Sequence, residues 1–204
     1  MGRRFFNPET GIWRFFGWVG DIVILSLLWA LCSIPLITCG AASTALYDSV
    51  VHVVRRKDDS FISRFFGTFR RELKMSCLST LLWGAVVSLF LFLYRILAGS
   101  GPDGKVVTVW SVVLILLLYL VLGILSWLFP VLSRFTFGFA DLNRTALRLA
   151  LGNILRSATM ALLIGLGIAA FSRNFYFVFF VPGLASWLSS FLIEPVFERY
   201  THSE

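Results

Sequence analysis

Residues Val106–Leu132 read VVTVWSVVLILLLYLVLGILSWLFPVL, a stretch without a single charged side chain. It exceeds the roughly 20 residues that an α-helix needs to cross a bilayer. Backbone polar groups in hydrocarbon must be paired within the segment, as they are in a helix, or within a closed barrel. A barrel strand would alternate apolar and polar residues over a short segment, whereas this stretch is continuously apolar. It therefore predicts a transmembrane helix.

Three further stretches are also predominantly apolar and long enough to span, with few charged residues: Gly17–Ile37, Met75–Leu97 and Ile154–Phe197. The last is interrupted by Ser172-Arg173-Asn174, which predicts two helices joined by a tight turn. The whole chain is 58% hydrophobic and only 14% charged, against about a quarter charged in soluble domains. We therefore expect an all-α polytopic transmembrane bundle with five clear spans, forming one membrane domain over residues 1–204.

A second helix is predicted directly after the first span, so that residues 17–54 form a kinked helical hairpin. Pro35 ends or kinks the first helix. After the small-residue stretch 38–44, the polar residues Thr44, Asp48 and His52 recur every four positions. This spacing is typical of an amphipathic helix. Two arrangements remain open: residues 17–54 cross the membrane once, or the amphipathic helix returns, fully or as a short re-entrant element.

The positions of the basic residues favour the returning arrangement. The chain has 18 Lys and Arg residues. If the helix returns, 15 of these basic residues lie inside, and the three outside are Arg95, Lys105 and Arg173. If residues 17–54 cross once, 12 basic residues lie inside, because Arg3, Arg4 and Arg14 are then outside as well. Cytoplasmic loops carry an excess of Lys and Arg. We therefore expect both termini in the cytoplasm, and this role of the basic residues argues against a nucleic-acid partner.

The segments between the spans have their own pattern. Residues 1–16 mix arginine with aromatic side chains, which suits an interfacial segment at the lipid headgroups. Residues 58–74 and 137–156 are predicted to form basic amphipathic helices on the cytoplasmic side. Two spans are expected in 75–132 and two in 154–197, followed by a short tail, 198–204.

Residues that would carry catalysis are scarce. Asp48 and His52 form the one predicted polar pair, and no third group completes a triad or a metal site. The three cysteines show no paired spacing of a disulfide framework or a zinc site. Residues 99–105, GSGPDGK, resemble a phosphate-binding loop, but Val106 replaces the required Ser or Thr. We therefore predict no catalytic residues, no cofactor, no metal and no enzymatic activity.

The first third of the chain resembles the YesL-like family of bacterial integral membrane proteins. The residues that carry the resemblance are Phe5–Gly11, Trp13–Gly17, Asp21, Leu31–Pro35, Thr38–Tyr47, Phe65-Phe66 and Phe69-Arg70. The resemblance implies the bacterial cytoplasmic membrane as the location. It brings no established activity, but implies an association with carbohydrate ABC importers and their permease subunits.

Eleven residues are candidates for partner docking or for packing of the bundle: Pro35, Gly40, Ser43, Thr44, Tyr47, Asp48, His52, Phe65, Phe66, Arg70 and Arg71. Small residues such as Gly40 allow helices to approach closely, so 35–47 predicts either a docking surface, an element lining a polar cavity, or a packed hairpin. Our first hypothesis is a non-enzymatic accessory or assembly subunit of a carbohydrate (oligosaccharide) ABC importer. The alternative is a small oligomeric membrane transporter acting on its own.

Overall fold

The structure is a computed structural model that describes residues 11–56, 60–99, 104–135 and 137–201, and these residues are almost entirely helical, with no β-strand among them. In chain order they form α1 (Gly11–Cys32), the 3-10 turn η1 (Leu36–Thr38), α2 (Cys39–Arg56), α3 (Phe61–Gly99), α4 (Gly104–Arg134), α5 (Phe139–Gly152), α6 (Ile154–Arg173), the 3-10 turn η2 (Phe175–Phe179) and α7 (Val181–Thr201). The predicted all-α class is confirmed. Most of the predicted interfacial segment 1–16, the centre of the 99–105 loop and the end of the tail lie outside the described residues.

Three described segments are long and apolar enough to cross a membrane: Phe61–Ile96, Val109–Arg134 and Ile154–Arg173. The apolar parts of α1 and α7 are shorter, Val19–Cys32 and Val181–Phe197. The chain is therefore a helical protein of membrane type with three candidate spans by length and composition, and the five predicted spans are not established on this measure.

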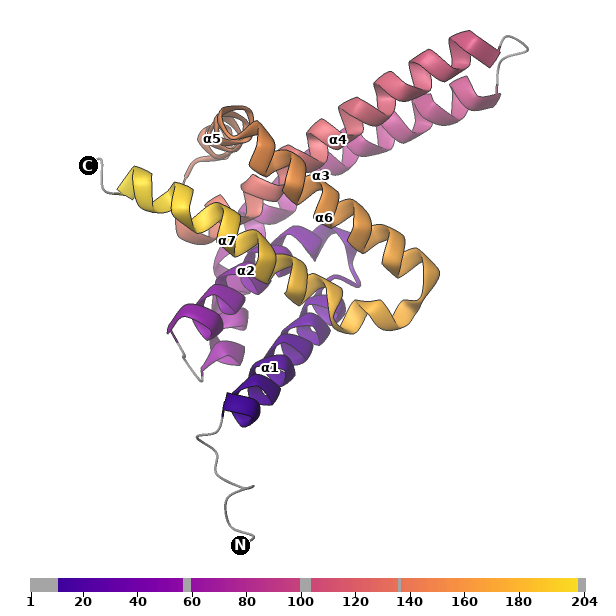
Figure 1. Cartoon of the computed structure of the whole chain (residues 1–204). Helices are drawn as coiled ribbons and strands as arrows, with labels where there is room; N and C mark the ends of the chain where they lie inside the picture. The colour runs from indigo at the N-terminus through magenta and orange to yellow at the C-terminus, as the bar shows by residue number, and fades with distance from the viewer. Residues whose placement is uncertain (1–10, 57–59, 100–103, 136, 202–204) are drawn as a thin grey trace, which may run out of the picture.

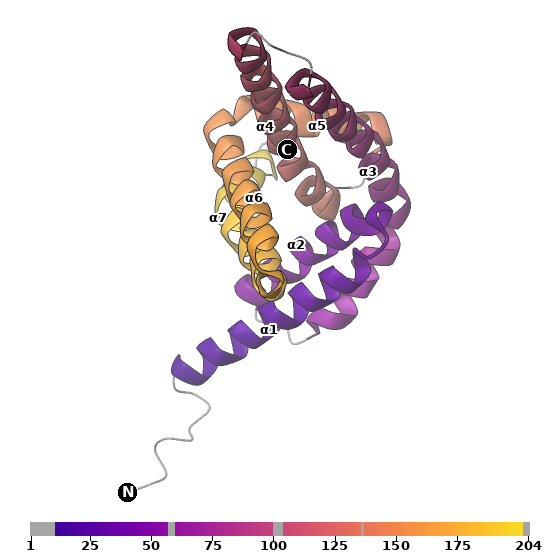
Figure 2. The same cartoon turned by 90° about the vertical axis from the view of Figure 1, so that its right-hand side faces the viewer.

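Helix α2 lies at the centre of the bundle and folds back along α1. It contacts α1, α3, α4 and α7 (Figures 1 and 2). The indole N–H of Trp29 on α1 donates to Ser43 Oγ at 3.0 Å, and Leu25, further from the turn, packs with Leu46 and Val50. The predicted span Gly17–Ile37 ends early, at Cys32, because Pro35 holds an extended backbone (φ −75°, ψ 110°) and disfavours helix in the residue before it.

Helix α3 corrects the predicted division at residue 74. The predicted cytoplasmic helix 58–74 and the following span form one continuous helix from Phe61 to Gly99. No proline or glycine stands between Gly67 and Gly84 to end it. At 1.5 Å per residue this helix is about 58 Å long, roughly twice the 30 Å of a hydrocarbon core. Its basic first half therefore extends beyond any membrane that its apolar second half crosses.

Two other predicted boundaries also shift. The predicted helix 137–156 is α5, which ends at Gly152; Asn153 leaves the helical conformation (φ −127°, ψ 53°) and α6 starts at Ile154. The turn predicted at Ser172–Asn174 is longer than expected, because the aromatic 3-10 turn η2 follows Asn174 before α7 begins. In the second half of the chain, the hydrophobic core surrounds the fully buried Trp127. Its indole N–H donates to Ser157 Oγ at 2.8 Å.

The far halves of α3 and α4 form a two-helix arm that extends beyond the other helices (Figure 1). We call residues 85–96 of α3 and 109–117 of α4 the arm. Its apolar side chains are exposed on both helices, for example Leu89, Phe92, Val109 and Leu116. An apolar two-helix arm of this kind is suited to lipid or to the helices of a membrane partner.

Candidate functional site

The predicted Asp48–His52 pair is present and buried in the second half of α2. His52 Nδ1 lies 2.8 Å from the Asp48 backbone oxygen and 3.4 Å from its Oδ1. Both side chains are about 4% exposed. A buried carboxylate is costly unless hydrogen bonds and opposite charge compensate it, so Asp48 needs more partners than His52 alone.

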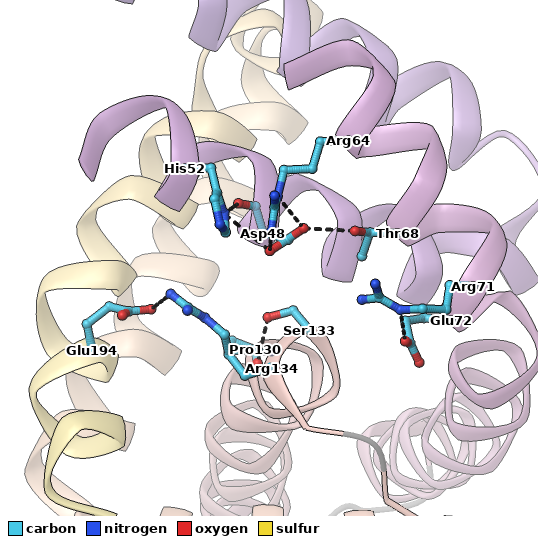
Figure 3. Close-up of polar contacts among 10 residues, drawn as sticks. All are labelled: Asp48, His52, Arg64, Thr68, Arg71, Glu72, Pro130, Ser133, Arg134 and Glu194. Carbon is cyan, nitrogen blue, oxygen red and sulfur yellow. Dashed lines mark hydrogen bonds and ion pairs between the residues drawn. The ribbon is translucent and has the colours of Figure 1, made fainter. Parts of the chain in front are cut away.

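Those partners come from the basic half of α3. Arg64 Nε donates to Asp48 Oδ2 at 3.0 Å, and its Nη2 donates to Oδ1 at 3.4 Å. The Thr68 hydroxyl donates to Asp48 Oδ2 at 2.8 Å (Figure 3). Arg64 and Thr68 stand four positions apart and so share one face of α3. This face meets α2 and holds the Asp48 carboxylate through charge-assisted hydrogen bonds.

A second charged group joins the ends of α4 and α7. Arg134 Nη2, from the last residue of α4, donates to Glu194 Oε1 on α7 at 2.7 Å. The Tyr47 hydroxyl donates to the same oxygen at 3.2 Å. Glu194 is buried, with 7% of its surface exposed. Tyr47, Glu194 and Arg134 thus connect α2, α7 and α4.

The charged side chains enclose a polar cavity of about 360 Å³. It lies between α2, α3 and the end of α4, and its lining residues are Asp48, His52, Arg64, Arg71, Glu72, Leu132, Ser133, Arg134 and Phe135. Three arginines and two carboxylates face it. Arginine donors in a partly enclosed site are suited to carboxylate or phosphate groups. Among the described residues, no group of three His, Cys, Asp or Glu side chains is arranged to hold a metal ion.

A second, apolar cavity has a volume of about 470 Å³. Its walls come from α1, α2, α4, α6, η2 and α7, and they are mostly apolar, with the hydroxyls of Ser43, Ser126, Ser186 and Ser189 among them. Mostly apolar walls with a few polar groups are usual for cavities that hold small molecules or cofactors.

The eleven sequence candidates separate into three groups by burial. Gly40, Thr44, Tyr47, Asp48, His52 and Phe65 are buried. Ser43 is half-buried, while Pro35, Phe66, Arg70 and Arg71 are exposed. In this conformation the buried residues contact other helices of this chain, and only the exposed ones are available to a partner.

Gly40 and Thr44 illustrate the packing role. The Thr44 hydroxyl lies 3.4 Å from Ser76 Oγ on α3, and α3 turns a stripe of small or polar residues toward α2, in which Thr68, Glu72, Ser76 and Ser79 are all buried. Small residues allow such close helix approach in membrane proteins. Of the readings left open for residues 35–47, packing describes Gly40 and Thr44, while Asp48 and His52, just beyond, line the polar cavity.

Five polar residues at the polar cavity were not among the sequence candidates: Arg64, Thr68, Glu72, Ser133 and Arg134. The first three carry a usable signal, since Arg64, Thr68 and Glu72 recur every four positions in the basic segment, as Thr44, Asp48 and His52 do in α2. Ser133 and Arg134 carry none, because only the folded bundle places the end of α4 beside α2 and α3.

Residues 22–94 match the model of a family described as a protein of unknown function, DUF624. The matched region covers the second half of α1, then α2 and most of α3, so it includes Asp48 and the helix that binds its carboxylate. It overlaps the part of the chain that carries the resemblance to the YesL-like family, and its description adds no activity. No curated protein and no solved structure shows a significant match to this chain.

Proposed function

We propose that this protein is a non-enzymatic accessory or assembly subunit of a bacterial carbohydrate ABC importer, bound to the permease subunits within the cytoplasmic membrane. The observation that carries the proposal is the arm. Both of its helices expose apolar side chains away from the bundle, so two helices are available for contacts with another membrane protein. Transmembrane helices associate through van der Waals packing and interhelical hydrogen bonds.

The basic first half of α3 offers a second contact outside the hydrocarbon. Arg70 and Arg71 are exposed, although Arg71 Nε donates to Glu72, whereas Arg64 is engaged with the buried Asp48. A partner surface that carries carboxylates would pair with these two guanidinium groups. The arm and these arginines lie on the same helix, so a partner that packs along α3 would meet both.

The choice of a carbohydrate importer comes from the resemblance to the YesL-like family. The family match over residues 22–94 covers all but the last two residues of the arm on α3, but its description names no partner. The proposed substrate class of the importer therefore rests on sequence resemblance, and the proposed mode of contact rests on the exposed arm.

We further propose five membrane crossings by apolar helices, with α2 returning inside the bundle and both termini in the cytoplasm. Arg64, Arg70, Arg71 and Lys74 lie in the first half of α3, and Arg134 ends α4 beside them. Arg95 and Arg173 lie near the opposite ends of α3 and α6. This separation agrees with the excess of basic residues on the cytoplasmic side of membrane proteins.

The test is affinity purification of the tagged protein from native membranes in mild detergent, with mass spectrometry of the co-purified proteins. We expect stoichiometric recovery of ABC permease subunits, absent with an unrelated membrane protein. The paired variant Phe92→Ala with Leu116→Ala should reduce recovery, as should Arg70→Glu with Arg71→Glu.

Matched controls separate docking from general damage. Leu155→Ala with Leu166→Ala removes two exposed apolar side chains from α6, and Arg144→Glu with Arg148→Glu reverses two exposed charges on α5. Both controls should retain the permease. Equal recovery by the arm variant and its α6 control would exclude the arm as the contact.

A transporter acting on its own is the second candidate, and the polar cavity is the observation that favours it. A cavity lined by arginines and carboxylates inside a helical bundle is suited to a polar solute. Recovery of the protein alone, as a homo-oligomer that moves sugars into liposomes, would replace the accessory role with this one.

A further inference from the structure

The polar and apolar cavities adjoin each other along two helices. On α2, Tyr47 lines the apolar cavity and the next residue, Asp48, lines the polar one. On α4, Phe129 and Pro130 line the apolar cavity, and Leu132 and Ser133 line the polar one. The contacts of Glu194 with Tyr47 and Arg134 lie at this junction and separate the two spaces. One elongated molecule occupies both spaces by displacing the Tyr47 hydroxyl from Glu194.

The length of the combined site matches one leaflet of a bilayer. Leu122, Leu125, Ser126 and Phe129 line the apolar cavity at helical spacing, so they form one stripe on α4 that reaches Ser133 in the polar cavity. The stripe is about 16 Å long at 1.5 Å per residue, close to half of the roughly 30 Å hydrocarbon core. Its polar end coincides with the end of the candidate span Val109–Arg134, where lipid headgroups lie.

The polar cavity retains hydrogen-bond donors for an anion. Arg71 Nε donates to Glu72 Oε1 at 2.6 Å, and the structure shows no partner among the described residues for its terminal nitrogens. Arg134 Nε is buried without a partner among them. Figure 3 shows the end of Arg71 directed toward the end of α4 that carries Ser133 and Arg134. The carboxylates that would repel an anion are each bound: Asp48 by Arg64 and Thr68, Glu72 by Arg71 Nε, and Glu194 by Arg134 Nη2.

The apolar cavity is open toward the outside of the bundle on the side of α6 and η2. Its lining residues Ile168, Phe171 and Phe177 are 57%, 45% and 43% exposed. Because α6 is a candidate span, this opening faces hydrocarbon when the protein is in a membrane. An acyl chain can enter there without crossing water.

We propose that the two cavities together bind one anionic membrane lipid, with its phosphate between Arg71 and Arg134 and one acyl chain along the α4 stripe. The inference does not depend on the proposed importer partner. The headgroup lies at the Arg134 end of α4, and the acyl chain extends toward the opening at α6 and η2. The lipid thereby joins α3, α4 and α7.

The test uses the full-length protein in nanodiscs and native mass spectrometry of the lipids that remain bound after release. Phosphatidylglycerol and diacylglycerol with identical chains are compared, so that the second lipid lacks the phosphate. We expect one retained phosphatidylglycerol per protein and at least about tenfold weaker retention of diacylglycerol, the ratio that corresponds to one charge-assisted hydrogen bond.

Two variants test the two ends of the site separately. Arg71→Gln removes an exposed headgroup contact, and Ala185→Phe fills the apolar cavity while leaving the charged residues intact. Each should weaken phosphatidylglycerol retention by about tenfold or more. Arg144→Gln on α5, whose side chain is 73% exposed, is the control and should bind as the wild type does. Thermal melting in detergent confirms that each variant is folded.

A competition experiment with soluble glycerol phosphate distinguishes a bound lipid from a bound free anion. Glycerol phosphate should compete with phosphatidylglycerol weakly, because it lacks the chain. Two results together would overturn the proposal: glycerol phosphate competes as strongly as the lipid does, and Ala185→Phe leaves binding unchanged. The polar cavity would then be a site for a free anion. Equal retention of both lipids, or full retention by both variants, would also overturn the proposal.

Discussion

Gly40 shows how a single absent side chain determines the approach of two helices. A Cβ at this position would overlap Thr80 Oγ1 on α3 and lie 2.7 Å from Phe129 Cε1 on α4. Phe129 also lines the apolar cavity. Gly40 therefore allows the start of α2 to contact α3 and α4 at once, and a larger residue must push one of them away.

We accordingly predict that Gly40→Ala lowers the free energy of unfolding by about 1–3 kcal/mol, the usual cost of overpacking. The control is Gly84→Ala on α3, where a Cβ meets nothing within 4 Å and where alanine is the better helix former. SDS titration followed by circular dichroism measures both. The explanation fails if Gly40→Ala is as stable as the control.

Asp48 is the residue on which the polar network converges. Asp48→Asn keeps the size of the side chain but replaces one acceptor oxygen by a donor, which then opposes Arg64 or Thr68. We expect a loss of about 1.5–3 kcal/mol in unfolding free energy, typical of a hydrogen bond to a charged group. Asp141→Asn is the control, since Asp141 is 67% exposed and lies 4.0 Å from Arg144. Equal stability of the two variants in the SDS titration would argue against a structural role for the network.

At the scale of elements, periodicity predicts the helices well and their connections poorly. The four-residue spacing of Thr44, Asp48 and His52 correctly indicates an amphipathic helix and the Asp48–His52 contact. The predicted boundary at residue 74 is wrong, because a change from charged to apolar composition marks where a membrane begins and not where a helix ends. Helix ends follow backbone signals such as Pro35 and Gly152-Asn153. Contacts such as Arg134 with Glu194 join residues 60 positions apart, and no local pattern encodes them.

Helix α5 is held against α3 by one hydrogen bond whose removal has a local effect. The Trp83 indole N–H on α3 donates to Asn143 Oδ1 on α5 at 2.9 Å, and Asn143 Nδ2 donates to Phe139 O at 2.8 Å. Trp83→Phe retains an aromatic ring and removes the donor, at a cost of about 0.5–1.5 kcal/mol. We expect faster amide exchange in residues 139–152 and little change elsewhere.

The control for this experiment is Trp110→Phe in the arm, where the indole is 55% exposed. Hydrogen exchange with mass spectrometry in detergent reports both variants. Exchange that increases across the whole chain would show that Trp83 supports the core of the bundle and not the attachment of α5.

At the scale of the whole molecule, the charged residues and the helix order together predict one orientation. The polar cavity gathers the basic half of α3, the end of α4 and the end of α2 at one end of the bundle. Ser172 lies at the other end of α6, just before η2. If α6 crosses the membrane with the basic end in the cytoplasm, Ser172 faces outward and Ser63 on α3 faces inward.

Single-cysteine labelling measures this arrangement directly. With Cys32, Cys39 and Cys77 replaced by alanine, Ser172→Cys and Ser63→Cys place thiols at two exposed positions. A membrane-impermeant maleimide added to intact cells should label Ser172→Cys, and should label Ser63→Cys only after permeabilisation. Because both positions are exposed in the protein, a difference between them reports the membrane barrier and not burial. Labelling of Ser63→Cys alone in intact cells would invert the orientation, and equal labelling of both would show that α6 does not cross the bilayer.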